Sequence, residues 1–384
     1  MRYKYLPEDF VVQEKLVSSP LPKPDKFRIF LLEKYNQETL KVVEKLARFW
    51  RIPMIKIGIA GIKDKYAHTF QYISTPAWVK KTPKWQGINL SPAGFSSHPL
   101  SAESLAWNAF TLVVREIKLE EKPTVEHRLS LLKEHGMPNY FDDQRFGSFV
   151  DGEWVGKHLF MGNMKRVLYL YCKSHAPEKL VSDILSSWGD WSRCLLLSQK
   201  ACWHAGERVF RFLSMEGHEK GFRHAVGLLD QRYVLLVANA YRSFLFNQAL
   251  SLRVKSEKGV FLATRAGEVF VPFEKKDLPR EGWIPAYDMP EEDPYLQRVL
   301  EEENLLLSDI KIRGIYKTTI HAKKRSLWVY PEIQETLWKE DEYFPQTFKL
   351  VISMKLPPGS YATLVLKWLA GSDNSFEKTN GKSL

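Results

Sequence analysis

Strand-like segments at both ends of the chain enclose a long helical middle, and this order most constrains the fold. Alternating polarity and β-branched or aromatic residues indicate strands in the first 150 residues and again near the C-terminus. From about Met161 to Val254 the apolar residues recur instead at helical spacing. We therefore expect an α+β fold in which a discontinuous domain carries an insertion.

The expected elements follow this division. Strands are expected over residues 10–14, 27–32, 55–62, 69–74, 110–116, 260–263, 269–271, 348–354 and 361–366. Helices are expected over residues 36–50, 125–134 and 291–303, besides those of the middle segment. The two strands within residues 260–271 are expected to form a hairpin, because a short loop that contains Gly267 joins them.

Basic residues outnumber acidic ones, with 56 Lys and Arg against 45 Asp and Glu and a net charge of +11. Such a surplus attracts polyanions, nucleic acid first and anionic membrane second. Aromatic residues form 13% of the chain and suit either base stacking or a filled core. Since the chain has neither 18 consecutive apolar residues nor a basic amphipathic helix, we expect no membrane association.

The cysteines and the N-terminus indicate the cytoplasm. The first residues lack the apolar segment of a signal peptide, and three cysteines cannot form a disulfide framework. Cys194, Cys202 and His204 lie close in sequence without paired C-x-x-C spacing, so buried or indifferent thiols are favoured over a zinc site. Motifs of nucleotide hydrolysis, serine hydrolases and zinc proteases are missing from the sequence.

The run GIKDKYAHTFQ, residues 61–71, is the best candidate for chemistry. A strand is expected on either side, and Gly61 permits a sharp turn. Asp64 stands between Lys63 and Lys65, two cations that favour the ionised form that a nucleophile or general base requires. Turns favour Asp regardless of chemistry, so a solvated surface turn is the simpler interpretation of the local sequence.

The run NYFDDQRFG, residues 139–147, is the second candidate. Tyr140 or Phe141 could stack on an exposed base, and Arg145 could bind a phosphate. The alternative is an aromatic loop that closes the edge of a core, because large aromatic side chains usually pack. Residues 322–325 and 357–363 are interpreted as a solvated basic patch and a structural turn.

Together these runs resemble the TruD family of tRNA pseudouridine synthases. Residues 61–71 match the family pattern G-x-K-D-x-x-A-x-T-x-Q in full. The other similar segments, in chain order, are residues 7–14 (P-E-D-F-x-V-x-E), 34–39 (K-x-N-x-x-T), 139–147 (N-Y-F-G-x-Q-R-F-G), 243–248 (S-x-L-F-N-Q) and 356–363 (L-P-x-G-S-[YF]-A-T). The ordered matches extend over nearly the whole chain.

The resemblance implies a catalytic α+β domain like that of other pseudouridine synthases, with a mixed or antiparallel sheet and helices. Residues 1–160 and 323–384 would form its two parts. Residues 161–322 would form a mainly helical α+β insertion, the TRUD domain. The resemblance therefore gives the discontinuous organisation specific boundaries.

The resemblance also implies roles for single residues. Asp64 would be the catalytic aspartate, with Lys4 as its ion partner. Phe141 would stack on the flipped target base, and Asn139 would hold the active-site loop or the substrate. The remaining residues expected to bind substrate are Lys63, Gln71 and Arg145.

Three departures from the family pattern bear on substrate preference. Asp142 stands where the family usually has Gly, which adds negative charge beside the base-stacking loop. Trp107 replaces a common Gly, and Lys367 with Trp368 replaces a usual Arg-Glu.

The implied reaction breaks the uracil N1–C1′ bond, turns the flipped base and rejoins it through C5, so no cofactor or metal is expected. Asp64 could attack C1′ or remove the C2′ proton, and the sequence leaves both open. We expect a monomeric cytoplasmic isomerase that acts on tRNA at position thirteen of the D arm, as is typical of the family. The competing hypothesis is a non-catalytic RNA-binding protein or RNA chaperone on the same fold.

Overall fold

The computed structural model describes residues 1–216, 221–315 and 318–370. The chain forms two compact units, and it leaves the first and later returns to it. Unit 1 contains Met1–Met137, Phe273–Lys275 and the described residues from Val329 onward, and unit 2 contains Pro138–Pro272 and Lys276–Trp328. The expected boundaries between the catalytic domain and the insertion domain, at residues 160/161 and 322/323, remain a prediction.

Unit 1 is built on a nine-stranded mixed sheet with the order β16-β17-β7-β2-β5-β3-β6, in which β1 pairs with β7 and β4 with β5. Strands β2 and β5 are parallel, and their neighbours are antiparallel. The strands are β1 (Arg2–Tyr3), β2 (Phe10–Leu16), β3 (Phe27–Tyr35), β4 (Gly58–Ile59), β5 (His68–Pro76), β6 (Ile88–Ser96), β7 (Leu105–Ile117), β16 (Glu332–Glu340) and β17 (Phe348–Leu356). Both ends of the chain supply strands, which confirms the expected discontinuous α+β fold.

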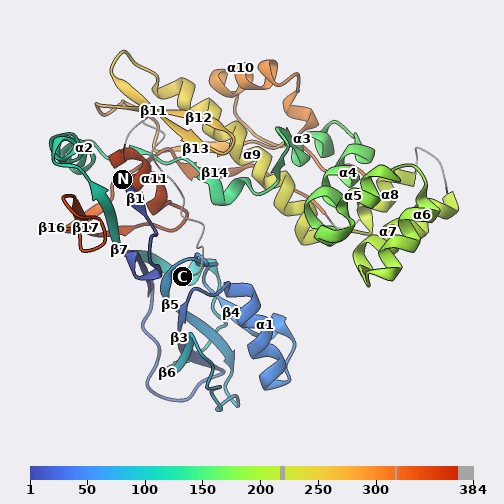
Figure 1. The fold of residues 1–384 in the computed structure, drawn as a ribbon, viewed down its shortest axis with the longest axis horizontal. Helices are drawn as coiled ribbons and strands as arrows, with labels where there is room; N and C mark the ends of the chain where they lie inside the picture. The colour runs from blue at the N-terminus through green and yellow to red at the C-terminus, as the bar shows by residue number, and fades with distance from the viewer. Residues whose placement is uncertain (217–220, 316–317, 371–384) are drawn as a thin grey trace. The chain divides into compact units, whose positions relative to one another are not determined.

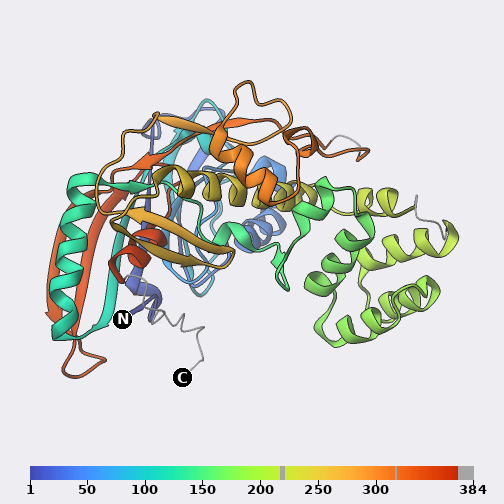
Figure 2. The same ribbon diagram turned by 90° about the horizontal axis from the view of Figure 1, so that it is seen from above.

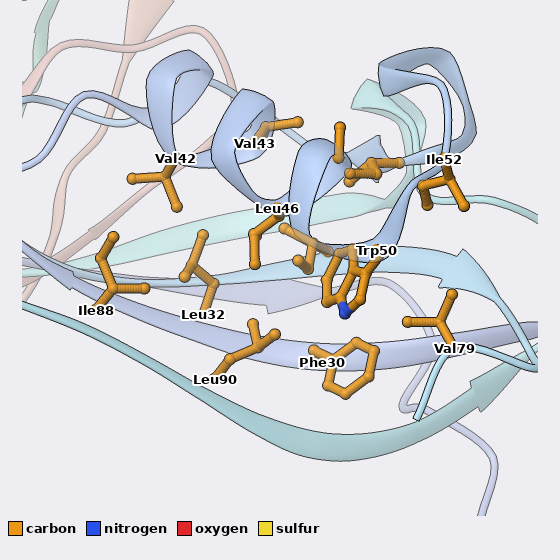
Figure 3. Close-up of a cluster of buried hydrophobic side chains, with 13 residues drawn as sticks. Phe30, Leu32, Val42, Val43, Leu46, Trp50, Ile52, Val79, Ile88 and Leu90 are labelled. Atoms are coloured by element: carbon orange, nitrogen blue, oxygen red, sulfur yellow. The ribbon is translucent and has the colours of Figure 1, made fainter. Parts of the chain in front are cut away.

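Helix α1 (Thr39–Trp50) covers the end of this sheet formed by β3, β5 and β6 (Figure 3). Its buried side chains lie at helical spacing, and they meet the buried side chains of the strands below. Trp50 stacks on Phe30 of β3 with ring centroids 5.7 Å apart. The helix ends where Arg51 adopts a left-handed conformation, with φ of 55°. The core cluster comprises Phe30, Leu32, Val42, Val43, Leu46, Ala47, Trp50, Ile52, Ile57, Ile73, Val79, Ile88 and Leu90.

Helices α2 (Lys122–His135) and α11 (Ala362–Ala370) pack against each other near β7, β16 and β17 (Figure 1). The indole nitrogen of Trp368 donates to the carbonyl of Arg128 at 2.9 Å. The strand predicted over residues 361–366 is therefore wrong. Nearly every side chain of α11 is buried, and a short, wholly buried helix has no polar face to reveal its period.

One other strand expectation needs correction, and not every observed strand was expected. Residues 55–62 contain only a turn of 3-10 helix, η2 (Met54–Lys56), and the two-residue strand β4. Strand β6 was not predicted, because Pro92 and Gly94 interrupt its sequence. It lies at the edge of the sheet, where the missing N–H of a proline needs no partner.

Unit 2 is mainly helical, as predicted for its middle segment. Helix α9 (Gln231–Val254) runs beside the hairpin of β11 (Gly259–Thr264) and β12 (Gly267–Pro272), which confirms the predicted hairpin (Figure 2). The other helices are α3 (Val155–Phe160), α4 (Met164–His175), α5 (Glu178–Ser186), α6 (Trp191–Lys200), α7 (His204–Glu216), α8 (Gly221–Gly227) and α10 (Pro294–Glu302). The other strand pairs are β9 (Phe149–Val150) with β10 (Glu153–Trp154) and β13 (Glu281–Ile284) with β14 (Lys323–Ser326).

Short elements complete the fold. Two-residue strands β8 (Met137–Pro138) and β15 (Trp328–Val329) mark two of the points where the chain passes between the units. The remaining 3-10 helices are η1 (Pro7–Asp9), η3 (Ala102–Ser104), η4 (Leu119–Glu121), η5 (Asp143–Phe146) and η6 (Leu307–Asp309).

Candidate active site

Asp64 lies on the loop between β4 and β5, which we call the Asp64 loop (residues 60–67). Its side chain is 27% exposed, and one carboxylate oxygen accepts a hydrogen bond from Lys4 Nζ at 2.9 Å. The Lys4 ammonium also lies 3.9 Å from the ring centroid of Phe10. The predicted ion pair is therefore present, and the aromatic ring holds the cation against the carboxylate.

A buried lysine supports this loop from below. Lys34 of β3 is fully buried, and its Nζ donates to the main-chain carbonyls of Asp64, at 2.7 Å, and Gln37, at 2.9 Å. Burial lowers the pKa of Lys34 to about 8, and the Asp64 carboxylate opposes that shift. The residue that carries the carboxylate is thus anchored through its own backbone.

Thr39 and Gln71 fix the rest of the loop. The Thr39 hydroxyl accepts from the main-chain N–H of Lys63 at 3.1 Å, and it lies 3.2 Å from Gln71 Oε1. Gln71 Nε2 donates to the carbonyl of Gly61 at 3.3 Å. Gln71 is fully buried. In this structure Gln71 holds the loop, and its expected contact with substrate stays a prediction.

Lys63 is also turned inward. Its Nζ lies 2.8 Å from a carboxylate oxygen of Glu14 and donates to Asn108 Oδ1 at 2.6 Å. Burial raises the pKa of Glu14, and the Lys63 charge opposes that shift. The other Glu14 oxygen accepts from the N–H of Tyr72 at 2.8 Å. A buried ion pair thus engages the Lys63 ammonium, and its expected contact with substrate stays a prediction.

The second candidate run forms a separate loop in unit 2, which we call the Phe141 loop (residues 139–147). Asn247 of α9 accepts from the N–H of Phe141 and donates to its carbonyl, both at 2.8 Å. The Phe141 ring is 6% exposed and meets the ring of Phe246 edge to face. The guanidinium carbon of Arg325 lies 3.9 Å from its centroid. In this structure Phe141 is packed, as the core-closing alternative predicts.

Asn139 and Arg145 are engaged in the same loop. Arg325 donates to the carbonyl and to Oδ1 of Asn139, and Asn139 Nδ2 donates to the carbonyl of Ser326 at 3.1 Å. These contacts fix Asn139, and its expected role in holding the loop or the substrate stays a prediction. Arg145 is half-buried, and its Nε donates to Ser243 Oγ at 3.1 Å.

The departures from the family pattern fall into buried or packed positions. Asp142 is buried and has a φ of −111°, so the residue that replaces the family's Gly needs no left-handed conformation. Lys355 Nζ lies 5.0 Å from the ring of Trp107. Both Lys367 and Trp368 are buried in α11. Asp142 therefore presents little of its charge to solvent.

Sequence reasoning missed several supporting residues. Glu14, Lys34, Thr39 and Asn247 stand inside segments that match family patterns, and that position was the only signal available for them. Arg325 belongs to the patch interpreted as solvated surface, and the structure instead turns its guanidinium onto the Phe141 loop. The local sequence of a basic run does not indicate whether one of its side chains faces solvent or packs against the protein.

The cysteines behave as isolated thiols. Cys172 and Cys194 are buried, and burial raises the pKa of Cys194 to about 11. Cys202 is exposed. Among residues 1–216, 221–315 and 318–370, His, Cys, Asp and Glu side chains form no group of three or more suited to a metal ion. Within the same ranges, the helices lack the length and apolarity that crossing a bilayer requires.

Comparison with known proteins places this arrangement in a family. The chain is 29% identical to a protein of Methanocaldococcus jannaschii described as a tRNA pseudouridine synthase D, over 96% of this chain and 91% of that one. It is 28% identical to the tRNA pseudouridine synthase D of Aquifex aeolicus, over 97% of this chain and 99% of that one. A crystal structure of a Methanosarcina mazei protein described as TruD has the same fold, with a TM-score of 0.66 and 22% identity over 96% of this chain and 92% of that one.

The family profile described as tRNA pseudouridine synthase D (TruD) matches residues 1–284, which include both loops described above. The predicted resemblance is therefore confirmed. The chain belongs to the tRNA pseudouridine synthase D (TruD) family of RNA-modifying isomerases.

Proposed function

We propose that this protein converts a uridine of tRNA to pseudouridine, at position thirteen in the D arm, and that Asp64 is its catalytic residue. The observation that carries the proposal is the setting of Asp64. Its carboxylate is partly exposed and paired with Lys4, while Lys34, Thr39 and Gln71 hold the loop beneath it. A reacting group that is open to substrate and rigidly supported meets the requirement for orientation in catalysis.

The reaction is an isomerisation in which atoms balance without a co-reactant. The N1–C1′ bond of uridine breaks, the base turns, and a C5–C1′ bond forms. C5 releases its proton, and N1 gains one. A single carboxylate can assist by attacking C1′ or by removing the C2′ proton, and the proposal leaves both roles open to Asp64. We therefore include no cofactor or metal in the proposal.

The target uridine must leave the base stack before it can reach a carboxylate, which costs a few kcal/mol. We propose that Phe141 stacks on the flipped base, which contributes about 1–3 kcal/mol. Because its ring is buried beneath Arg325, the proposal includes a rearrangement of that guanidinium when RNA binds. Asn139 then positions the loop, and Arg145 binds a phosphate.

The basic surface supplies salt-dependent affinity for the tRNA backbone. We propose that the protein acts as a monomer in the cytoplasm. Size-exclusion chromatography with light scattering tests the oligomeric state.

Release of tritium from tRNA transcribed with [5-³H]uridine tests the assignment of Asp64. Wild type is expected to release one tritium per modified uridine, and Asp64→Ala none. The matched control is Asp183→Asn, which alters an exposed carboxylate on α5 and should behave as wild type. Equal release by Asp64→Ala and wild type would remove Asp64 from the mechanism. Tight tRNA binding without release by either protein would favour the non-catalytic RNA binder.

A U13→C transcript tests the position. Release should fall by one equivalent in this transcript, and mapping of pseudouridine in the unmutated tRNA should locate the product at position thirteen. An unchanged release would assign the activity to another uridine.

A further inference from the structure

A cavity opens in unit 1 beside the base of the Asp64 loop. Its volume is about 480 Å³, within the range of ligand pockets. Tyr35 at the end of β3 pairs in register with His68 at the start of β5. Tyr35 directly follows Lys34, which holds the Asp64 carbonyl. Because adjacent strand residues face opposite sides of the sheet, the Tyr35 side chain lies on the face opposite to that of Lys34. The cavity is lined by Glu8, Glu33, Tyr35, His68, Trp85, Gly87, Ile88 and Asn89.

Glu33 is fixed within this cavity. One of its carboxylate oxygens lies 2.8 Å from His68 Nε2, and the other accepts from Asn89 Nδ2 at 3.2 Å. The hydrogen bond from His68 keeps the pKa of Glu33 below its usual range, so the carboxylate is ionised at neutral pH. Its side chain remains 35% exposed. Each carboxylate oxygen has two lone pairs, so Glu33 can accept a further hydrogen bond on each.

The walls around Glu33 are flat. The rings of Tyr35 and His68 meet edge to face with centroids 5.9 Å apart, and Trp85 lines the same cavity. The Tyr35 hydroxyl donates to Glu8 at 2.7 Å, which raises the pKa of Tyr35 to about 12 and keeps the phenol neutral. Planar walls around a carboxylate suit a planar ligand with two adjacent hydrogen-bond donors.

We propose that this cavity binds a guanine base of the substrate RNA, near the target uridine in the folded RNA. Among the four bases, only guanine presents two adjacent donors, N1–H and the N2 amino group, that match the two oxygens of one carboxylate. Tyr35 and Trp85 supply stacking surfaces for that base. This inference deepens the proposed function and depends on it.

A pocket for phosphate or for another base fits the lining less well. Glu8 and Glu33 would repel a phosphate. Adenine and cytosine each offer a single amino group on the pairing edge, and uracil offers a single N–H, so each leaves one Glu33 oxygen without a new partner. The remaining alternative is a small organic cation such as spermidine, and the experiment below separates it from guanine.

A transcript pool tests the proposal. The tRNA substrate is made with the nucleotides around the target uridine randomised, and pseudouridine formation is mapped by sequencing after a short reaction. Wild type is expected to prefer guanine at one position by roughly tenfold, as one bidentate base contact provides. Glu33→Gln should lose this preference, because an amide offers one acceptor and one donor. The matched control Glu44→Gln, an exposed residue of α1, should retain it.

Inosine at the preferred position separates recognition from folding. Inosine lacks the N2 amino group and keeps the shape of guanine. In wild type its use should raise KM several-fold, whereas in Glu33→Gln guanine and inosine should have equal KM. If Glu33 had only a structural role, the Glu33→Gln substitution would change the KM values of the guanine and inosine substrates by the same factor. A stable Glu33→Gln protein that still prefers guanine to inosine overturns the proposal.

Three further outcomes have defined meanings. If wild type forms pseudouridine without any guanine preference, the guanine pocket is wrong and the proposed function stands. If wild type forms no pseudouridine, the proposed function itself fails. Spermidine that competes with RNA in wild type but not in Glu33→Gln would assign the cavity to a cation and overturn the base proposal.

Discussion

The Asp64 loop and the Phe141 loop both match family patterns, the first in full and the second except at Asp142, yet their side chains are exposed and buried in opposite ways. The Asp64 loop is supported by buried charges, Lys34 and the pair of Lys63 with Glu14, and it leaves a carboxylate at the surface. The Phe141 loop is held by amide and guanidinium groups, and it buries its aromatic ring. A sequence motif thus identifies a region, and tertiary contacts decide which side chain solvent can reach.

The comparison implies different costs for loosening each loop. A substitution that leaves a buried charge without its partner lowers the free energy of unfolding most. Removing hydrogen bonds to a buried amide lowers it less, and breaking a partly exposed ion pair lowers it least. Substitutions that remove one of these contacts at a time should therefore destabilise the protein in this order. If packing alone held both loops, the losses of stability would not follow it.

The largest expected effect follows Lys63→Met, which leaves the Glu14 carboxylate buried without its cation. We expect the free energy of unfolding to fall by about 3–5 kcal/mol. The double variant Lys63→Met with Glu14→Gln should recover much of that loss, because it leaves no unpaired charge. Urea unfolding monitored by circular dichroism measures both. A double variant no more stable than the single one would contradict the buried-charge account.

In the Phe141 loop, Asn247→Ala removes the two hydrogen bonds that Asn247 makes to the N–H and the carbonyl of Phe141. We expect a loss of about 1–3 kcal/mol, since each of the two hydrogen bonds contributes about 0.5–1.5 kcal/mol. Gln297→Ala, at an exposed position of α10, is the matched control and should change little. Thermal unfolding measures the difference, and equal stability of the two variants would refute the proposed locking of Phe141.

The third test measures how stability and activity change with pH as Lys34 loses its proton. Its pKa in the folded protein is about 8, below the value of about 10.4 in an unfolded chain. Between these values the unfolded chain keeps a proton that the folded protein has released, so this group makes stability rise with pH across that window. Activity should move in the opposite direction, because loss of the ammonium weakens its hold on the Asp64 carbonyl.

We therefore expect kcat/KM of wild type to fall above about pH 8, while its stability relative to Lys34→Met rises from about pH 8 to about 10.4. Lys34→Met should be less active and lack that alkaline decline. Tritium release and unfolding measured across this range give both profiles. The same decline in Lys34→Met would assign it to another group.

The smallest effect on stability is expected for Lys4→Met. The ion pair with Asp64 is partly exposed, so its loss should cost less than about 1 kcal/mol. Its loss should nevertheless reduce kcat/KM by about a hundredfold, because a misplaced reacting group is poorly oriented. Lys65→Met, which alters an exposed lysine of the same loop, is the control. Equal activity of these two variants would remove Lys4 from the site.

Much of the fold followed from the sequence, because periodicity reports burial directly where an element has one polar face. The strands β2, β3, β5, β7 and β17, the helices α1 and α2, and the hairpin of β11 and β12 were predicted in this way. The prediction failed where burial is uniform, as in α11. It also failed where an edge strand tolerates a proline, as in β6.

For the site, the sequence by itself determined which segments matter, because the ordered matches single out Asp64, Lys4 and the run around Phe141. Only the tertiary structure decided what each side chain does. Lys63 and Gln71 were expected at the substrate, and they lie beneath the loop. Lys34 and Arg325 had no assigned role, and they hold the two loops. The direction of a long polar side chain depends on partners distant in sequence, and no local pattern specifies them.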